Sequence, residues 1–264
     1  MKIDLTGKTA LVTGSTAGIG RAIVNGLVAS GARVVVNGRR QETVDQVVAD
    51  AKAANSGADV VGVAADVSTE EGCAALVEAV PDVDILVNNA GIFEPKSFFD
   101  ISDADWIRFF ETNVMSGVRL ARGYMPGMLE RDWGRVLFIS SESALQIPKE
   151  MIHYGLTKTS QLALSRGLAE LTAGTGVTVN SVLPGPTRSD GVDEFLKSMA
   201  RDAGMSADEL AKGFVKMHRP TSLIQRFASV EEVANMVVYV ASKEASATNG
   251  AALRVDGGVV RSIA

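Results

Sequence analysis

Short runs of consecutive hydrophobic residues alternate with amphipathic stretches along the whole chain. The runs are rich in β-branched residues, and such uninterrupted apolar strands are typical of a parallel sheet that is buried on both faces. Strands are expected at 9–13, 33–36, 60–64, 84–88, 135–140, 177–183 and 251–255. Because helical periodicity follows each run, the pattern predicts an α/β fold: a doubly wound parallel sheet of about seven strands, with helices on both faces and right-handed crossovers.

The stretches between the strands predict the helices, and several of their first residues support them. Helices are expected at 19–30, 42–54, 69–80, 103–130, 150–172 and 231–241. Two starts have the spacing of a capping box, Ser68 with Glu71 and Ser229 with Glu232. After Ser102, acidic residues in the first turn favour the positive end of the helix dipole.

No repeat, linker or low-complexity stretch divides the sequence, so residues 1–264 are expected to form a single domain. Residues 190–226 interrupt the alternation with short helical pieces and are expected to form a lid over the substrate. The phenylalanine and methionine residues of this segment favour an apolar pocket wall. The segment also carries a basic cluster, which either meets an anionic substrate or lies on a solvated face: Lys212, Lys216, His218 and Arg219.

Composition and charge exclude several classes of function. The net charge of −5 argues against a nucleic-acid or anionic-membrane partner. The N-terminal stretch lacks the apolar region of a signal peptide, and no apolar run approaches the ~20 residues of a membrane span, so a cytoplasmic location is expected. The single cysteine, Cys73, cannot form an internal disulfide. Two histidines without a Cys/His cluster predict no metal site.

The junction of the first strand and first helix has the sequence of a dinucleotide site of the Rossmann type, in Thr13-Gly14-Ser15-Thr16-Ala17-Gly18-Ile19-Gly20. Glycines here let the backbone approach a pyrophosphate that faces the helix N-terminus. At the end of the second strand, an acid suits the ribose hydroxyls of NAD and an arginine suits the 2′-phosphate of NADP. Gly38 is followed there by Arg39 and Arg40, which favours NADP(H) over NAD(H).

A candidate acid–base pair lies on the helix expected at 150–172. Tyr154 and Lys158 are four residues apart, so they share one helix face. An ammonium near a phenol favours the phenolate and lowers the pKa of the tyrosine. A tyrosine activated in this way can protonate a carbonyl oxygen or deprotonate an alcohol.

Taken together, these elements resemble the short-chain dehydrogenase/reductase family, and within it the 3-oxoacyl-carrier-protein reductases. The resemblance covers essentially the whole chain. The matching residues follow the family order and spacing: the glycine loop, Asp66-Val67, Asn88-Asn89-Ala90-Gly91, Asn113, Ser141, Tyr154-(x3)-Lys158 and Pro184-Gly185.

The resemblance implies a role for each match. Ser141 would hydrogen-bond the substrate oxygen, Tyr154 would be the general acid or base, and Lys158 would lower its pKa and hold the nicotinamide ribose. Asn113 would hold a water in a proton relay. The implied cofactor-binding residues are Gly14, Ser15, Thr16, Gly18, Ile19, Gly20, Arg39, Asp66, Val67, Asn89, Ala90, Gly91, Tyr154, Lys158, Pro184, Gly185, Thr187 and Ser189. The family also implies a homotetramer or homodimer.

The expected function is therefore an NAD(P)-dependent oxidoreductase that moves a hydride between nicotinamide and a small-molecule carbonyl or secondary alcohol. His153 and Glu142 adjoin the implied catalytic residues and are expected to shape the pocket. Ala17 replaces a second basic residue common in NADP-selective members, which leaves dual use of NAD and NADP open.

Two alternatives stay open at this point. One is a 3-oxoacyl-thioester reductase acting on a carrier protein or CoA; Asp132 and Thr175 weaken it, because docking arginines are expected at those positions. The other is a cofactor-binding regulatory protein without catalysis. An intact Ser, Tyr, Lys and Asn set argues against this second alternative.

Overall fold

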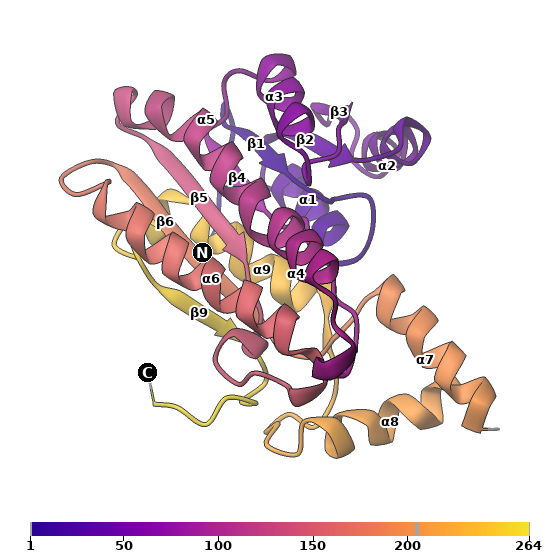
Figure 1. Cartoon of the computed structure of the whole chain (residues 1–264). Coiled ribbons are helices and arrows are strands. Elements are labelled where there is room, and N and C mark those ends of the chain that lie inside the picture. Colours follow the sequence, from indigo (N-terminus) through magenta and orange to yellow (C-terminus); the bar gives the residue numbers. More distant parts are fainter. Residues whose placement is uncertain (1, 204–205, 264) are drawn as a thin grey trace.

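The computed structural model describes residues 2–203 and 206–263. Its main sheet has seven parallel strands in the order β3-β2-β1-β4-β5-β6-β9, as the alternating pattern predicted (Figure 1). The strands are β1 (Thr9–Val12), β2 (Arg33–Gly38), β3 (Val60–Ala64), β4 (Ile85–Asn88), β5 (Gly134–Ile139), β6 (Val177–Pro184) and β9 (Ala252–Val255). The order reverses between β1 and β4, and ligands of such sheets bind outside the carboxyl ends of the strands at this switch point.

Helices cover both faces of the sheet, and alternate strand residues point to one or the other. Ala10 and Val12 pack against the first group of helices, whereas Leu11 packs against the second. The first group is α1 (Gly18–Ala29), α2 (Gln41–Ala54) and α9 (Val230–Val240). The second group is α3 (Glu70–Ala79), α5 (Ser116–Glu130) and α6 (Ile152–Glu170).

The helix starts agree with the predicted capping residues at two places out of three. Ser229 and Ser102 each form a full capping box with the acidic residue three positions later. At α3 the prediction was wrong by one residue, because Thr69 rather than Ser68 is the N-cap and accepts from the Gly72 amide at 3.0 Å. The Ser68 hydroxyl instead donates to the Asp66 carboxylate at 2.7 Å.

The helix expected at 103–130 contains an irregular turn. It begins as α4 (Asp103–Phe110), widens into a π-helical turn at Glu111–Met115 and continues as α5. Turns of this kind insert one extra residue per turn and are frequent at functional sites. Here the turn holds Asn113, which is 1 % exposed.

The segment 190–226 extends away from the sheet as two helices, α7 (Asp190–Ala203) and α8 (Ala207–His218), at the lower right of Figure 1. Two short strands, β7 (Thr187–Arg188) and β8 (Ala228–Ser229), pair with each other at its base. In the part of the chain that the structure describes, no helix combines the length and the apolar character needed to cross a bilayer.

Candidate active site

The loop between β1 and α1 needs its glycines for two different reasons. Gly14 has a φ of +59° and Gly18 a φ of +54°, a conformation that other residues adopt at a cost. At Gly20 the reason is space, since a Cβ atom would lie 2.5 Å from Asn89 Nδ2 and 2.6 Å from the Gly14 carbonyl oxygen. A Cβ on Gly14 would lie 2.9 Å from Ala90 Cα. The loop is therefore held close to the residues that follow β4.

Side chains of the neighbouring strand ends fix this loop. Asn89 Nδ2 donates to the carbonyl oxygens of Thr13 and Gly14 at 2.9 and 3.0 Å, and Thr13 Oγ1 accepts from the Asn89 amide at 3.0 Å. Asn37, in β2, accepts from the Gly14 amide at 3.4 Å and donates to the Val63 carbonyl oxygen at 3.1 Å. Asn37 was not predicted as a site residue from the sequence; its signal is a polar residue in an otherwise apolar strand.

The first turn of α1 presents a backbone amide to an anion. Its N-cap residue Ala17 supplies no capping side chain, and the turn contains no acidic residue. Instead, the Gly18 amide donates to a carboxylate oxygen of Asp190, the first residue of α7, at 3.0 Å. A loop amide that already holds a carboxylate fits the pyrophosphate of a dinucleotide, which carries the same charge and the same acceptor oxygens.

The predicted adenosine end of the site lies along the ends of β2 and β3. A Cβ on Gly38 would lie 2.5 Å from Thr16 Cγ2, so any side chain at this position would require Thr16 to move. Arg39 is exposed and forms no ion pair with any residue that the structure describes. Val67 is buried, and Asp66 Oδ1 accepts from the Ser68 amide at 3.0 Å.

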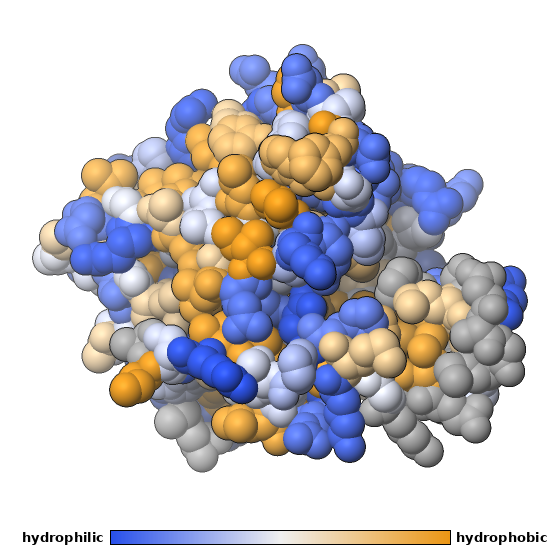
Figure 2. Space-filling model, turned by 60° about the horizontal axis from the view of Figure 1, so that its bottom comes forward, coloured by the Kyte–Doolittle hydropathy of each residue, from blue (hydrophilic) through white to orange (hydrophobic). Residues whose placement is uncertain are grey.

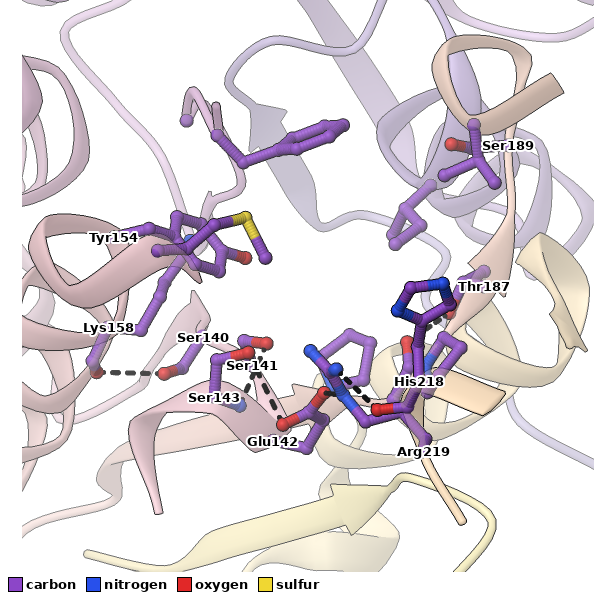
Figure 3. A pocket seen from close by; sticks show the side chains of 18 of the residues that line it. Ser140, Ser141, Glu142, Ser143, Tyr154, Lys158, Thr187, Ser189, His218 and Arg219 are labelled. Atoms are coloured by element: carbon purple, nitrogen blue, oxygen red, sulfur yellow. Dashed lines mark hydrogen bonds and ion pairs between the residues drawn. The ribbon is translucent and has the colours of Figure 1, made fainter. Parts of the chain in front are cut away.

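A cavity of about 420 Å³ lies beside the glycine loop. Several residues that the resemblance implied lie together in its wall, from five different parts of the chain (Figure 3). They are Ile19, Asn89, Gly91, Ser141, Tyr154, Lys158, Pro184, Gly185, Thr187 and Ser189. The fold thus brings the loop, the ends of β4, β5 and β6, and α6 to one place.

Tyr154 and Ser141 both line this cavity. Burial raises the pKa of Tyr154 to about 12, and the Ser141 side chain is the largest opposing influence. The direction is opposite to the one that the Tyr-x-x-x-Lys spacing predicted. The reason is burial of the phenol; the ammonium nitrogen of Lys158 lies 5.6 Å from the centre of the tyrosine ring and donates to the Ile139 carbonyl oxygen.

Lys158 is almost fully buried, and burial lowers its pKa to about 7. Its Nζ donates to the Ile139 carbonyl oxygen at 2.9 Å and to Gln161 Oε1 at 3.3 Å. Gln161 Nε2 in turn donates to the carbonyl oxygen of Asn113 at 2.6 Å. A side-chain amide therefore links the lysine to the π-helical turn, which the sequence analysis did not foresee.

Asn113 is held by three contacts of its own side chain. Its Oδ1 accepts from the Ile92 amide at 2.8 Å, and its Nδ2 donates to the Ile92 carbonyl oxygen and to Thr157 Oγ1, both at 3.0 Å. A Cβ on Gly91 would lie 3.3 Å from Asn113 Oδ1 and 3.4 Å from Lys158 Nζ. Asn113 therefore positions the chain segment that follows β4 beside the lysine.

The two serines beside Ser141 are engaged with other partners. Ser140 Oγ donates to the Lys158 carbonyl oxygen at 2.9 Å, and Ser143 Oγ donates to Glu142 Oε2 at 3.3 Å. Ser141 Oγ accepts from the Ser143 amide at 3.1 Å. Of the three serines, Ser141 is the one whose side chain lowers the pKa of Tyr154.

The cavity extends from Tyr154 toward α7 and α8. Met199 and Phe214 contribute apolar wall, as the composition of this segment predicted. Of the basic cluster, His218 and Arg219 line the cavity, and Lys216 is exposed. The side chain of Lys212 lies outside the described part of the chain.

Of the two residues expected to shape the pocket, the structure places one there. Glu142 lines the cavity. The expectation was wrong for His153, which is fully buried. The centre of its ring lies 4.1 Å from that of Phe109 and 5.9 Å from that of Trp106. The helix turn points this ring into the body of the protein, away from Tyr154, which follows it directly in the chain.

Comparisons with known proteins identify the family of this chain. The sequence profile of the family described as short chain dehydrogenase matches residues 8–200. The chain is 53% identical to the uncharacterized oxidoreductase YvaG of Bacillus subtilis and 33% identical to the 3-oxoacyl-[acyl-carrier-protein] reductase FabG of Aquifex aeolicus. These alignments cover 100% and 98% of this chain and all of each relative.

A solved structure shows the same fold over its whole length. L-sorbose reductase from Gluconobacter frateurii, complexed with NADPH and L-sorbose, superposes with a TM-score of 0.94 at 34% identity, and each chain is covered completely. Profile, relatives and fold all indicate the same family. The chain belongs to the short-chain dehydrogenase family and is an NAD(P)-dependent oxidoreductase acting on CH–OH or C=O groups.

Proposed function

We propose that the protein is an NADP(H)-preferring oxidoreductase in which Tyr154 is the general acid or base for a small carbonyl or secondary alcohol. The observation that carries the proposal is that Tyr154, Ser141 and Lys158 line one cavity, which adjoins the glycine loop. Ser141 orients the substrate oxygen, and Tyr154 gives it a proton during reduction or removes one during oxidation. The bound dinucleotide supplies or accepts the hydride.

In this proposal the cofactor is held along the ends of the central strands. The glycine loop binds the pyrophosphate, with Gly14, Ser15, Thr16, Gly18, Ile19 and Gly20. Asp66 and Val67 flank the adenine; Asn89, Ala90 and Gly91 lie along the riboses. Lys158 binds the nicotinamide ribose, and Pro184, Gly185, Thr187 and Ser189 surround the nicotinamide. Asn113 holds the water of a proton relay that reaches Lys158.

The preference for NADP(H) rests on Arg39 and Gly38. Arg39 is exposed at the end of β2, and its guanidinium suits a 2′-phosphate because it is a planar, permanently charged donor. Gly38 carries no carboxylate that would select the ribose hydroxyls of NAD, and a side chain there would require Thr16 to move. The NADPH bound by L-sorbose reductase supports this choice.

The segment 190–226 acts as the substrate lid of a single domain that comprises residues 1–264. Its residues Val192, Met199 and Phe214 line the same cavity as Ser141 and Tyr154. A 3-oxoacyl thioester is the second candidate substrate, supported by the similarity to a reductase of that class. Asp132 speaks against docking of a carrier protein, since its carboxylate accepts from the Gly176 amide at 2.7 Å and adds negative charge there.

We place the protein in the cytoplasm as a homotetramer or homodimer without a nucleic-acid or membrane partner. Large apolar side chains are exposed on and near α4 and α6, namely Phe99 at 93 %, Ile107 at 63 % and Leu156 at 43 %. Figure 2 shows hydrophobic side chains gathered in a band across one face of the protein. A second copy of the chain that packs against α4, α5 and α6 would bury such side chains.

The test is a screen of carbonyl reduction and alcohol oxidation. Consumption of NADPH and NADH is followed over a panel of ketones, and formation of both is followed over the matching alcohols. The proposal expects turnover of at least one ketone–alcohol pair, with NADPH used more efficiently than NADH. Absence of turnover from a folded, cofactor-binding protein across the whole panel would contradict it.

A further inference from the structure

An ion pair lines the cavity directly beside the proposed reaction centre. Glu142 follows Ser141 in the chain, and its Oε1 accepts from Arg219 Nε at 2.7 Å. The side chain of Glu142 is 4 % exposed and that of Arg219 is 14 % exposed. Figure 3 shows Arg219 reaching from the end of α8 toward Glu142, on the side of the cavity that faces Tyr154.

Negatively charged side chains outnumber positively charged ones around this ion pair. Glu150 also lines the cavity, and its Oε1 lies 3.6 Å from Arg219 Nη1. Two carboxylates thus surround one guanidinium. Lys158 is directed to the Ile139 carbonyl oxygen, away from this end of the cavity. The side of the cavity beyond Ser141 therefore has no spare positive charge for an anionic substrate among the groups just named.

We propose that Glu142 and Arg219 determine specificity by binding hydroxyl groups of a neutral, polyhydroxylated carbonyl substrate, such as an open-chain ketose. This inference rests on the proposed function. A hydroxyl is both donor and acceptor, so it can donate to the carboxylate and accept from the guanidinium without separating the two. Hydrogen bonds to charged groups are stronger than those between neutral groups, which gives such a substrate an advantage over an apolar ketone.

A carboxylate on the substrate would meet the opposite situation. It would place a third negative charge beside Glu142 and Glu150, around the single guanidinium of Arg219. Like charges close together disfavour each other, and the buried carboxylate of Glu142 is poorly screened by solvent. The pair therefore selects against keto acids and for neutral hydroxylated ketones.

Three small open-chain ketones test the proposal: 1,3,4-trihydroxybutan-2-one, butan-2-one and 4-oxopentanoate. NADPH consumption gives kcat/KM for each with wild type and with Glu142→Gln. In the wild type, the trihydroxy ketone is expected to exceed butan-2-one at least tenfold and to exceed 4-oxopentanoate further. In Glu142→Gln, the positive charge of Arg219 has one neighbouring carboxylate fewer. The ratio of kcat/KM for the trihydroxy ketone to kcat/KM for butan-2-one is therefore expected to fall about tenfold or more, and kcat/KM for 4-oxopentanoate is expected to rise.

Two further variants separate specificity from stability. Glu142→Gln/Arg219→Gln keeps a hydrogen-bonding pair of similar shape without charges, and it should equalise the neutral and anionic ketones while it remains folded. Asp50→Asn removes one charge from an ion pair of similar length outside the cavity, the 2.6 Å bond with Arg21, and should leave all three values unchanged.

The outcomes distinguish a failure of this inference from a failure of the proposed function. Preference of the wild type for 4-oxopentanoate or butan-2-one, or an equal loss on all three ketones in Glu142→Gln, overturns the inference and leaves the oxidoreductase intact. Turnover of other ketones, but of none of these three, also overturns the inference and leaves the oxidoreductase function intact. No turnover of any carbonyl or alcohol overturns both.

Discussion

Gly20→Ala should damage the cofactor site while it leaves the sheet intact. The new Cβ would lie 2.5 Å from Asn89 Nδ2 and 2.6 Å from the Gly14 carbonyl oxygen. Non-bonded heavy atoms prefer about 3.5–4 Å, so Asn89 has to move by roughly 1 Å. The movement breaks the bonds from Asn89 Nδ2 to Thr13 and Gly14, which are 2.9 and 3.0 Å long. At about 0.5–1.5 kcal/mol for each bond, the expected loss of stability is about 1–3 kcal/mol.

The displaced loop should bind the dinucleotide more weakly than this loss alone implies, because its amides no longer converge on the pyrophosphate. Thermal unfolding gives the stability change, and titration with NADPH followed by fluorescence gives the dissociation constant. Gly213→Ala is the matched control: it lies in α8 with no atom within 4 Å of its Cβ, and alanine there should add about 0.5–1 kcal/mol without changing cofactor affinity. Wild-type NADPH affinity in Gly20→Ala would refute the role of the loop.

Three further predictions concern charged residues of the site. Arg39→Ala should weaken NADPH several-fold and leave NADH unchanged, and an unchanged ratio of the two dissociation constants would exclude this arginine as the 2′-phosphate ligand. Asp190→Asn removes the carboxylate charge held at the Gly18 amide, so NADPH should bind a few-fold tighter; weaker binding would contradict competition at that amide. Burial lowers the pKa of Lys158 from the ordinary value of 10.5 to about 7 in the folded protein. Between these two values the unfolded chain binds more protons than the folded protein, so the free energy of unfolding rises with pH. The destabilising effect of the buried lysine is therefore smallest at high pH. The melting temperature of Lys158→Met relative to wild type should therefore fall as pH rises from 7 to 10, and a constant difference would refute the lowered pKa.

The sequence predicted the sheet well because its strands carry an almost purely apolar signal. The run at 177–183 and the strand Val177–Pro184 differ by one residue, since strands buried on both faces leave little ambiguity in periodicity. Local details were less predictable. The π-helical turn around Asn113 depends on contacts with Ile92 and Thr157, which lie 21 and 44 residues away in the chain.

The candidate site also contains residues that the sequence could predict and contacts that it could not. Motif residues such as Gly14, Tyr154 and Lys158 are recognisable because local spacing fixes their relation to a strand or a helix. Arg219 was predicted as part of a basic cluster, yet its partner Glu142 lies 77 residues earlier, so the ion pair arises only from the tertiary fold. Burial likewise decides the pKa values of Tyr154 and Lys158, and a one-dimensional spacing carries no information about it.

The central claim is that the phenol of Tyr154 transfers the proton, and Tyr154→Phe tests it most directly. The measurement is the catalytic rate of this variant on a substrate found in the screen, alongside its melting temperature and its NADPH affinity. Phenylalanine fills the same space, so fold and cofactor binding should persist while the rate falls by about 10²–10⁴-fold. In wild type, alcohol oxidation should increase with pH and continue to increase above the ordinary tyrosine pKa of 10.0, because burial raises the pKa of the Tyr154 phenol, and this increase should vanish in the variant. A rate near that of wild type, with the pH dependence retained, would contradict the account.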